Sequence, residues 1–165
     1  MSETIMQELY EQEEDTQKDK FLMFKLGNES YGIDIRYVTE IIGIQPVTEV
    51  PELPEYIRGI INLRGKIIPV MDVRLRFKKQ LREYTDRTCV VVINVANNSV
   101  GLIVDGVADV MLIPDTDIVA PPEISRNCNR YIKGIGKIGS DVKLILDCEK
   151  LLTDNELDTI NEVVN

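Results

Sequence analysis

The side chains of this 165-residue chain that could do chemistry are few, and their types limit what that chemistry could be. There is no histidine, the residue that most often serves as a general acid, a general base or a metal ligand. A Ser-His or Cys-His nucleophile is therefore excluded. Three cysteines lie far apart and form no CxxC pair, at Cys89, Cys128 and Cys148. We expect reduced, mostly buried thiols, with no disulfide framework, no metal site and no cofactor.

Aspartates offer the strongest remaining route to an enzyme or a small-ligand-binding module. Such a site would need the carboxylates of Asp72, Asp105, Asp109 and Asp147 to converge. Alternatively, Asp72 and Asp147 end apolar runs, where a carboxylate accepts backbone N–H bonds and caps the next turn. We favour this structural role and keep the aspartate site as the competing hypothesis. The glycines of "GIGKIG", residues 134–139, lie in an expected hairpin and open no helix, which argues against nucleotide binding.

The stretch "GIINLRGKIIPVMD", residues 59–72, places a cation at the tip of an apolar hairpin. Gly65 suits a turn position with positive φ, and Pro69 suits a bend because it cannot donate to a ladder. Arg64 is either an exposed turn cation or a fixed contact for a partner's carboxylate, since a guanidinium on a rigid hairpin loses little freedom on binding. We favour the partner contact, because the repeat described next has Gly139 at the matching place.

Two blocks of the sequence match later blocks without a gap. Residues 21–44 lie over 90–113, and residues 56–77 lie over 131–152. The identical pairs include Asn28 with Asn97, Ser30 with Ser99, Gly32 with Gly101, Tyr56 with Tyr131, Gly59 with Gly134 and Asp72 with Asp147. These are not generic strand residues that a chance alignment would pair. We infer an internal duplication of a unit of about seventy residues.

Each copy is typical of short strands separated by turns. A unit of this size closes most easily into a five-stranded barrel, which leaves no exposed sheet edge. We therefore predict a mostly β protein of two SH3-like five-stranded barrels from an internal duplication, with short connecting helices and a C-terminal helix. The first lobe is predicted at 21–80 and the second at 88–152, and edge strands may exchange between them. The C-terminal helix is predicted at 153–165, where a Thr or Asp cap precedes one apolar stripe, and it should pack on the second barrel.

Two shorter helical segments are also expected. One is a helical turn at 35–42, where the second copy should have a strand, and the other is a short linking helix in "DVRLRFKKQL", residues 72–81. Within the first of these segments, Glu40 places a charge between Val38 and Ile41. A charge among apolar side chains is either an ordinary exposed residue or part of a protein interface.

The charge of the chain is concentrated at its start. The net charge is −9, and residues 1–20 hold seven acids against Lys18 and Lys20. We expect this acidic tail to be disordered. Phosphate binding needs a positive face, so the composition argues against nucleic acid as a partner. No apolar run approaches the roughly 18 residues of a membrane span, and the chain begins with no signal-peptide pattern, so we expect a cytoplasmic protein without direct membrane insertion.

Paired motifs in both halves resemble the CheW family of bacterial chemotaxis coupling proteins. They are "YGIDIRYVTEI", "NLRG" and "IIPVMDVR" in the first half, and "VGLIVDGVADV" and "YIKGIGKI" in the second. The resemblance implies that about residues 18–158 form one CheW-like domain. It implies two SH3-like barrels with a hydrophobic groove between them, and an adaptor that is not an enzyme.

The resemblance also implies partners. They are the cytoplasmic tip of methyl-accepting chemotaxis receptors and the regulatory domain of the histidine kinase CheA. The adaptor would couple the first to the second in membrane-associated receptor arrays, where ring assembly with CheA is one arrangement. The receptor tip, a helical hairpin, would lay an apolar stripe into the groove.

Individual residues follow from the same resemblance. Val38, Glu40 and Arg64 match family positions tied to receptor or kinase contact, and Gly59 matches another sensitive position that has an equally good backbone explanation. Arg64 would form an ion pair at the groove rim. The kinase would pack near Ile41 and the Gly59 hairpin. The insertion in the second copy, around Ile124, falls where the second barrel of family members meets a kinase domain.

Overall fold

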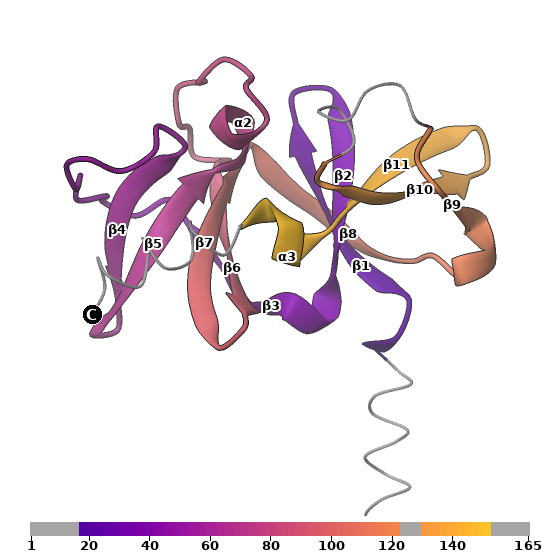
Figure 1. Ribbon diagram of the computed structural model, residues 1–165, viewed down its shortest axis with the longest axis horizontal. Helices are drawn as coiled ribbons and strands as arrows, with labels where there is room; N and C mark the ends of the chain where they lie inside the picture. The colour runs from indigo at the N-terminus through magenta and orange to yellow at the C-terminus, as the bar shows by residue number, and fades with distance from the viewer. Residues whose placement is uncertain (1–16, 123–129, 153–165) are drawn as a thin grey trace, which may run out of the picture.

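The fold consists of two β-sheets that pack side by side (Figure 1). The computed structural model describes residues 17–122 and 130–152. Lobe A is a six-stranded sheet in the order β8-β1-β2-β11-β10-β9, and lobe B is a five-stranded sheet in the order β3-β6-β7-β5-β4. The mostly β fold class with two β lobes is thus confirmed. No helix in these ranges is long and apolar enough to cross a bilayer.

The bounds of the strands are those of short elements joined by tight turns. Lobe A contains β1 (Lys20–Leu26), β2 (Glu29–Asp34), β8 (Gly106–Leu112), β9 (Ile118–Val119), β10 (Ile132–Ile138) and β11 (Asp141–Leu146). Lobe B contains β3 (Val38–Gly43), β4 (Ile57–Leu63), β5 (Lys66–Asp72), β6 (Cys89–Val95) and β7 (Asn98–Val104). In the part of the chain that the structure describes, short helices connect or follow the strands: η1 (Ile35–Tyr37), α2 (Val73–Arg76), η2 (Asp115–Asp117) and α3 (Cys148–Leu151).

The repeat units and the lobes do not coincide. The first hairpin of each copy, β1–β2 or β6–β7, lies in the sheet that holds the later strands of the other copy. Lobe B is therefore one continuous stretch, 38–104, and lobe A is assembled from 20–34 and 106–146. This differs from the predicted lobes at 21–80 and 88–152, because the exchange involves whole hairpins and not only edge strands. A duplicated unit buries the same surface whether its hairpin pairs within its own copy or across, so sequence pattern alone does not distinguish the two arrangements.

The exchange is reciprocal, and a glycine makes each half of it possible. β2 runs parallel to β11 with Gly32 opposite Ile145, and β7 runs parallel to β5 with Gly101 opposite Val70. A Cβ on Gly32 would lie 2.9 Å from Met23 Sδ within its own hairpin and 3.2 Å from the Ile145 side chain. A Cβ on Gly101 would lie 2.7 Å from the Val90 side chain within its own hairpin and 2.9 Å from the Val70 side chain. The repeated glycine thus lets the transferred hairpin approach its new neighbour closely.

Three hydrophobic cores hold this arrangement. One fills the inside of lobe B and includes Ile61, Ile68 and Val92, and a smaller one fills lobe A around Phe21 and Ile113. The largest core lies between the sheets and takes buried side chains from both of them, including Leu22, Phe24, Ile33, Val91, Ile93, Leu102, Leu146 and Leu151. Because this core takes side chains from both sheets, the lobes form one packed body.

Arg76 ties the lobes together inside this interlobe core. It is only 7% exposed, and its guanidinium carbon lies 4.4 Å from the ring centroid of Tyr56 and 4.7 Å from that of Tyr131. Its Nε donates to the carbonyl oxygen of Leu151 in α3 at 2.9 Å. The two tyrosines are the matched residues of the repeat, so one cation lies between equivalent rings of both copies.

The structure confirms only some of the predicted helices. The linking helix exists as α2, although it is shorter than the segment 72–81. The helical turn predicted at 35–42 is wrong beyond Tyr37, because residues 38–43 form β3, which pairs with β6. Its β-branched residues complete the sheet edge, as the matching β8 does in lobe A. The predicted C-terminal helix at 153–165 and most of the acidic tail at 1–20 lie outside the described residues.

Candidate protein-binding face

Arg64 lies in a two-residue turn between β4 and β5, and both turn residues have positive φ. Arg64 has φ 52° and Gly65 has φ 87°, as a type I′ hairpin turn requires. The Asn62 side chain accepts a hydrogen bond from the Gly65 N–H at 2.8 Å. This geometry fixes the direction in which the Arg64 side chain leaves the hairpin.

The Arg64 guanidinium forms an ion pair with the Glu40 carboxylate on β3. β3 and β4 are the two edges of the sheet in lobe B, so the pair forms where the curled sheet brings its edges together. The Arg64 side chain remains 72% exposed and the Glu40 side chain 32% exposed. Arg64 is therefore no free cation: a partner's carboxylate would have to share it with Glu40 or displace Glu40.

The backbone at Arg64 carries a cost that the second copy avoids. The left-handed conformation costs a residue with a Cβ roughly 1–2 kcal/mol, and the matching Gly139 adopts φ 59° without that cost. An exposed ion pair returns about 0–1 kcal/mol. Stability therefore does not explain an arginine here, and an outlier of this kind favours a functional role.

Val38 and Ile41 lie on β3, at the margin of the interlobe core. Val38 is half-buried and packs against that core, whereas Ile41 is 43% exposed. Ile41 is paired with Val91, which is fully buried in the same core. Residues that are directly opposite on paired strands share one face, so Ile41 extends the apolar interlobe surface outward to the edge of lobe B.

Val110 and Leu112 are exposed apolar residues at the matching edge of lobe A. They were not among the binding residues predicted from the sequence. Val110 matches Ile41, is 51% exposed, and is paired with the buried Leu22. Leu112, two residues further along β8, is 63% exposed. The alignment of 21–44 over 90–113 could have found Val110, because it sets Val110 over Ile41, but it sets Leu112 over Gly43 and gives no signal for Leu112.

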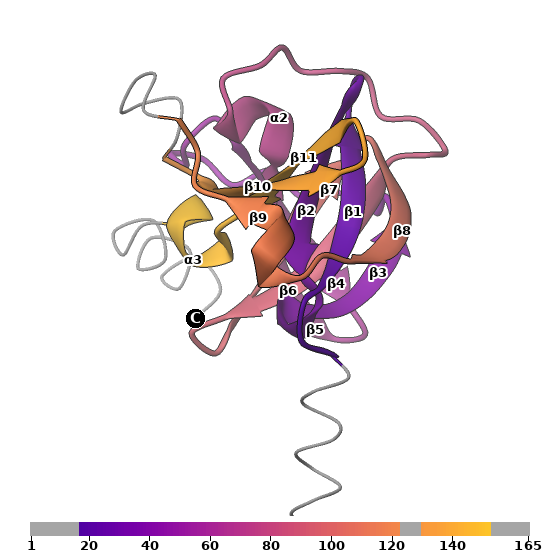
Figure 2. The same cartoon turned by 90° about the vertical axis from the view of Figure 1, so that its right-hand side faces the viewer.

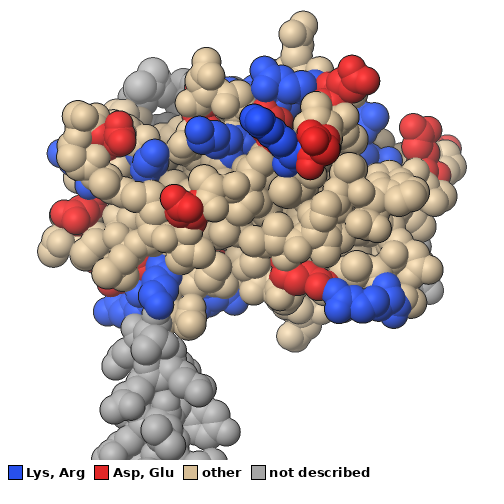
Figure 3. All heavy atoms as spheres, turned by 180° about the vertical axis from the view of Figure 1, so that it is seen from behind, with Lys and Arg blue, Asp and Glu red and all other residues tan. Residues whose placement is uncertain are grey.

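The two edge strands lie on the same side of the molecule. Figure 2 shows β3 and β8 together at the right of the view. From that side, charged side chains gather along the upper and lower rims, and the band between them is largely uncharged (Figure 3). Exposed apolar side chains bordered by charge are typical of a surface that binds another protein. We call Ile41, Val110 and Leu112 the apolar edge face.

Gly59 has a structural explanation. Its φ is 143°, and a Cβ there would lie 2.1 Å from the carbonyl oxygen of Thr48. Thr48 exchanges two 2.9 Å backbone hydrogen bonds with Ile60, which joins the chain after β3 to the edge strand β4. Gly134 makes room for β9 in the same way in lobe A. Gly59 therefore permits sheet closure, and a partner contact at this residue is not needed to explain it. Ile124 lies outside the described residues.

The aspartates of the competing hypothesis serve the fold. Asp72 caps α2 by accepting from the N–H groups of Arg74 and Leu75, and Asp147 caps α3 in the same manner. The second Asp72 oxygen accepts from the Tyr84 hydroxyl at 2.7 Å. The capping role predicted for Asp72 and Asp147 is confirmed. Within the described ranges no group of three His, Cys, Asp or Glu side chains could hold a metal ion.

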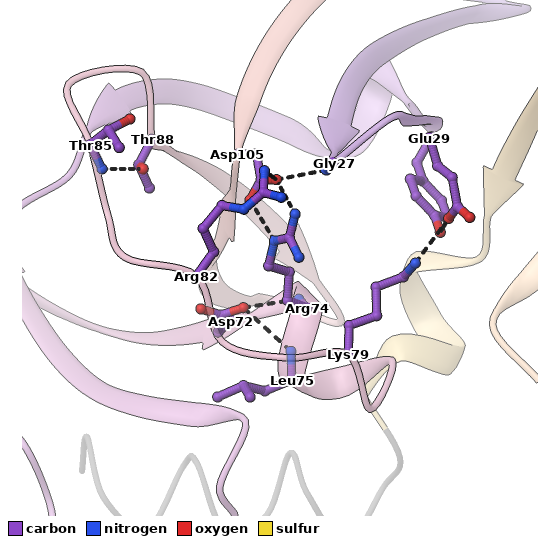
Figure 4. Close-up of polar contacts among 11 residues, drawn as sticks. Gly27, Glu29, Asp72, Arg74, Leu75, Lys79, Arg82, Thr85, Thr88 and Asp105 are labelled. Atoms are coloured by element: carbon purple, nitrogen blue, oxygen red, sulfur yellow. Dashed lines mark hydrogen bonds and ion pairs between the residues drawn. The ribbon is translucent and has the colours of Figure 1, made fainter.

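Asp105 is the centre of a polar cluster between the lobes. Figure 4 shows the side chains of Arg74 and Arg82 directed at its carboxylate. Arg74 Nε donates to it at 2.8 Å and the Gly27 N–H at 2.7 Å. The Arg74 hydrogen bond, with help from Gly27, holds the pKa of Asp105 below its usual value against the opposing effect of burial. A carboxylate bonded in this way is a structural anion, and Asp109 on β8 lies apart from this cluster.

The cysteines show no reactive environment among the described residues. Cys89 and Cys148 are free thiols, as predicted, and Cys148 is buried. Burial, reinforced by the neighbouring Asp147, raises the pKa of the Cys148 thiol to about 12. A thiol with such a pKa is almost entirely protonated at neutral pH, so Cys148 is not a nucleophile. Cys128 lies outside the described residues.

Comparison with known proteins agrees with this geometry. Residues 20–156 match the family model of the CheW-like domain. The chain is 39% identical over 150 residues to the chemotaxis protein CheW of Klebsiella aerogenes, with 90% of each chain covered. It is 33% identical over 135 residues to the chemotaxis protein CheW of Bacillus subtilis, covering 81% of this chain and 86% of that one. The crystal structure of the scaffolding protein TtCheW from Thermoanaerobacter tengcongensis superposes with a TM-score of 0.77 at 36% identity, covering 84% of this chain and 94% of that one.

The fold is that of a CheW-like domain, which a solved scaffolding protein shares. The family match extends over most of the chain and includes both copies of the repeat. The chain belongs to the CheW family of chemotaxis proteins.

Proposed function

We propose that this protein is a non-catalytic adaptor that binds both chemotaxis receptors and the histidine kinase CheA, and so couples the state of the first to the activity of the second. The observation that supports this most directly is the apolar edge face, which repeats one exposed side chain, Ile41 or Val110, on the edge strand of each lobe. The names of the relatives place them in chemotaxis. The protein would act at the cytoplasmic side of membrane-associated receptor arrays, and rings formed with CheA are one arrangement.

The receptor would bind at the apolar edge face. A helical hairpin presents apolar side chains three and four residues apart, and such a stripe fits a narrow apolar margin between two edge strands. Burial of side chains the size of Ile41, Val110 and Leu112 stabilises a complex by roughly 1.5–3 kcal/mol for each one fully covered. A complex stabilised by a few such side chains can still dissociate, as a binding event that responds to a signal requires.

The Arg64–Glu40 pair would orient a partner at the rim of this face. Exposed charges contribute more to specificity and to the rate of association than to affinity. A carboxylate of the partner can compete with Glu40 for the guanidinium because the pair is exposed on one side. The kinase regulatory domain would pack on lobe B near Ile41 and the β4–β5 hairpin, so both partners would lie close to this ion pair.

Co-sedimentation with a receptor cytoplasmic fragment, with and without CheA, tests the proposal. Val110→Asp should abolish co-sedimentation with the receptor fragment because it puts a charge in the centre of the apolar edge face. Leu81→Asp is the matched control: Leu81 is 48% exposed, close to the 51% of Val110, but lies in the loop after α2. Equal retention of the two variants by the receptor fragment would rule out the edge face as its site.

A further inference from the structure

The charge of this protein is divided between its folded body and its ends. The described residues hold 18 lysines and arginines against 17 aspartates and glutamates, a net charge of +1. Residues 1–16 hold six acids and residues 153–165 hold four, with no lysine or arginine in either segment. The net negative charge of the chain therefore comes from segments outside the described body, whose own net charge is close to zero, so any attraction between them depends on local groups of cations.

One cavity of the body combines cations with aromatic rings. It has a volume of about 550 Å³ and lies between the end of α2 and the strands β2 and β10 of lobe A. Its aromatic wall consists of three rings in sequence: Tyr31 and Phe77 have centroids 5.5 Å apart, and Phe77 and Tyr131 have centroids 5.6 Å apart. The Phe77 and Tyr131 rings are stacked, whereas the Tyr31 ring is tilted by 39° to Phe77, and together they offer an apolar surface to a side chain that enters the cavity.

The cations at the rim of this cavity outnumber its one carboxylate. Glu29 accepts from the Tyr31 hydroxyl at 2.5 Å and from Lys79 Nζ at 3.0 Å, so its charge is already neutralised (Figure 4 shows Lys79 reaching Glu29). Among the described residues, neither the exposed Lys78 ammonium nor Arg130 forms an ion pair, and the Arg130 guanidinium carbon lies 5.4 Å from the centroid of the Tyr131 ring. Two cations are thus available to an incoming anionic segment.

The C-terminal segment begins next to this cavity. The carbonyl oxygen of Leu151 accepts from Arg76, which lines the cavity, and residue 153 follows two positions later. Residues 153–165 contain four acids and, at spacings of three and four, apolar residues: Leu157, Ile160, Val163 and Val164. The N-terminal segment 1–16 is instead joined at the opposite end of β1 from the Gly27 turn that leads to Glu29. Proximity and composition therefore both favour the C-terminal segment over the N-terminal segment as the occupant of the cavity.

We propose that residues 153–165 bind in this cavity, with apolar side chains on the rings of Phe77 and Tyr131 and carboxylates at Lys78 and Arg130. The segment is joined to the body, so its local concentration is high and weak contacts are enough to hold it. An acidic partner that needs the same cations would first have to displace it.

Zero-length carbodiimide crosslinking of the full chain at low concentration, followed by peptide mapping, tests this proposal. Lys79 and Glu29 lie 3.0 Å apart, so their crosslink must form and calibrates the reaction. We expect Lys78 to link to Asp154, Glu156, Asp158 or Glu162 within one chain. Links from Lys78 to residues 1–16, to a second chain, or to no carboxylate while the Lys79–Glu29 link forms would each overturn the proposal.

Two controls distinguish a bound segment from a loose electrostatic tether. Lys66 is exposed on lobe B and bonds to Ser99, so it should link to none of the four acids. Replacing Leu157 and Ile160 together by Asn keeps every charge but removes the apolar contacts, and it should reduce the Lys78 links at least fivefold. Unchanged linking in this double variant would mean that the rings do not bind the segment, which would overturn the assignment of the cavity.

Discussion

Arg64 has a left-handed backbone conformation that glycine would adopt more easily. A glycine substitution can therefore test whether Arg64 contributes to stability or to binding. Arg64→Gly relieves the positive φ but loses the exposed pair with Glu40. The relief is at least as large as the loss, so the variant should be as stable as the parent protein or more stable by up to about 2 kcal/mol. Binding to the receptor fragment or the kinase should weaken measurably in the same variant. A large loss of stability in urea titration would show that Arg64 is structural.

The carboxylate of Asp105 gives the protein a predictable response to acid. Its pKa is lowered in the folded state by Arg74, so the folded state holds its proton less tightly than the unfolded state does. Its stabilising contribution is therefore complete above the usual aspartate pKa of about 4 and is lost as the pH falls through the lower folded value. Urea unfolding at neutral pH and at about pH 3.5 should show the loss.

Asp105→Asn supplies the control for this response. The variant should be less stable at neutral pH, because the paired Arg74 remains partly buried without an anion. Its stability should then depend less on pH over the acid range than that of the parent protein. Equal pH dependence in both proteins would assign the acid response to other carboxylates, such as Glu29, whose pKa is lowered by its hydrogen bonds to Tyr31 and Lys79.

At the scale of the strands, Gly59 and Gly43 form a matched pair for testing sheet closure. A Cβ at Gly59 would lie 2.1 Å from the Thr48 carbonyl oxygen, whereas a Cβ at Gly43 would have no atom within 4 Å. Gly59→Ala should therefore cost several kcal/mol or prevent folding, since the obstacle is backbone that cannot rotate away. Gly43→Ala should lie within about 0.5 kcal/mol of the parent protein in thermal or urea unfolding. Similar stabilities for the two variants would refute the explanation that Gly59 is needed for sheet closure in lobe B.

The sequence predicted the elements of each copy better than it predicted their partners. Alternating apolar residues and turn glycines are local signals, and they place the hairpins at 20–34, 57–72, 89–104 and 132–146 correctly. The choice between a helical turn and an edge strand at residues 38–43 depended on pairing with β6, which comes some fifty residues later in the register Ile41 to Val91. Long-range pairing of this kind has no local signal, so the exchange of hairpins could not be predicted either.

The candidate site was predicted in the same uneven way. Glu40 and Arg64 were selected separately, and the structure joins them as one ion pair because the sheet edges meet. Val110 was missed although the repeat sets it over Ile41, and Leu112, which falls on Gly43, had no signal in the repeat, since exposure depends on which strands lie at the sheet edge. Gly59 was predicted with two equal explanations, a partner contact and a backbone requirement, and backbone packing accounts for it.

At the scale of the molecule, the interlobe core predicts cooperative unfolding of both lobes. Arg76→Met removes the cation from between Tyr56 and Tyr131 and leaves the Leu151 carbonyl oxygen without that donor. We expect a loss of about 2–4 kcal/mol with a single unfolding transition. Arg87→Met, at an exposed arginine, should change the stability by no more than about 0.5 kcal/mol. Two separate transitions in the parent protein would show that the lobes are independent.

The continuous stretch of lobe B has a consequence for how the protein is made. A ribosome synthesises β1 and β2 first, yet the strand that flanks β1 is β8 and the one that flanks β2 is β11, both encoded much later. Residues 38–104 can close as a sheet as soon as they emerge, because all their pairings lie within that stretch. During synthesis from the N-terminus, lobe B should therefore fold before lobe A. The β1–β2 hairpin stays without its neighbouring strands until β8 and β11 have left the exit tunnel.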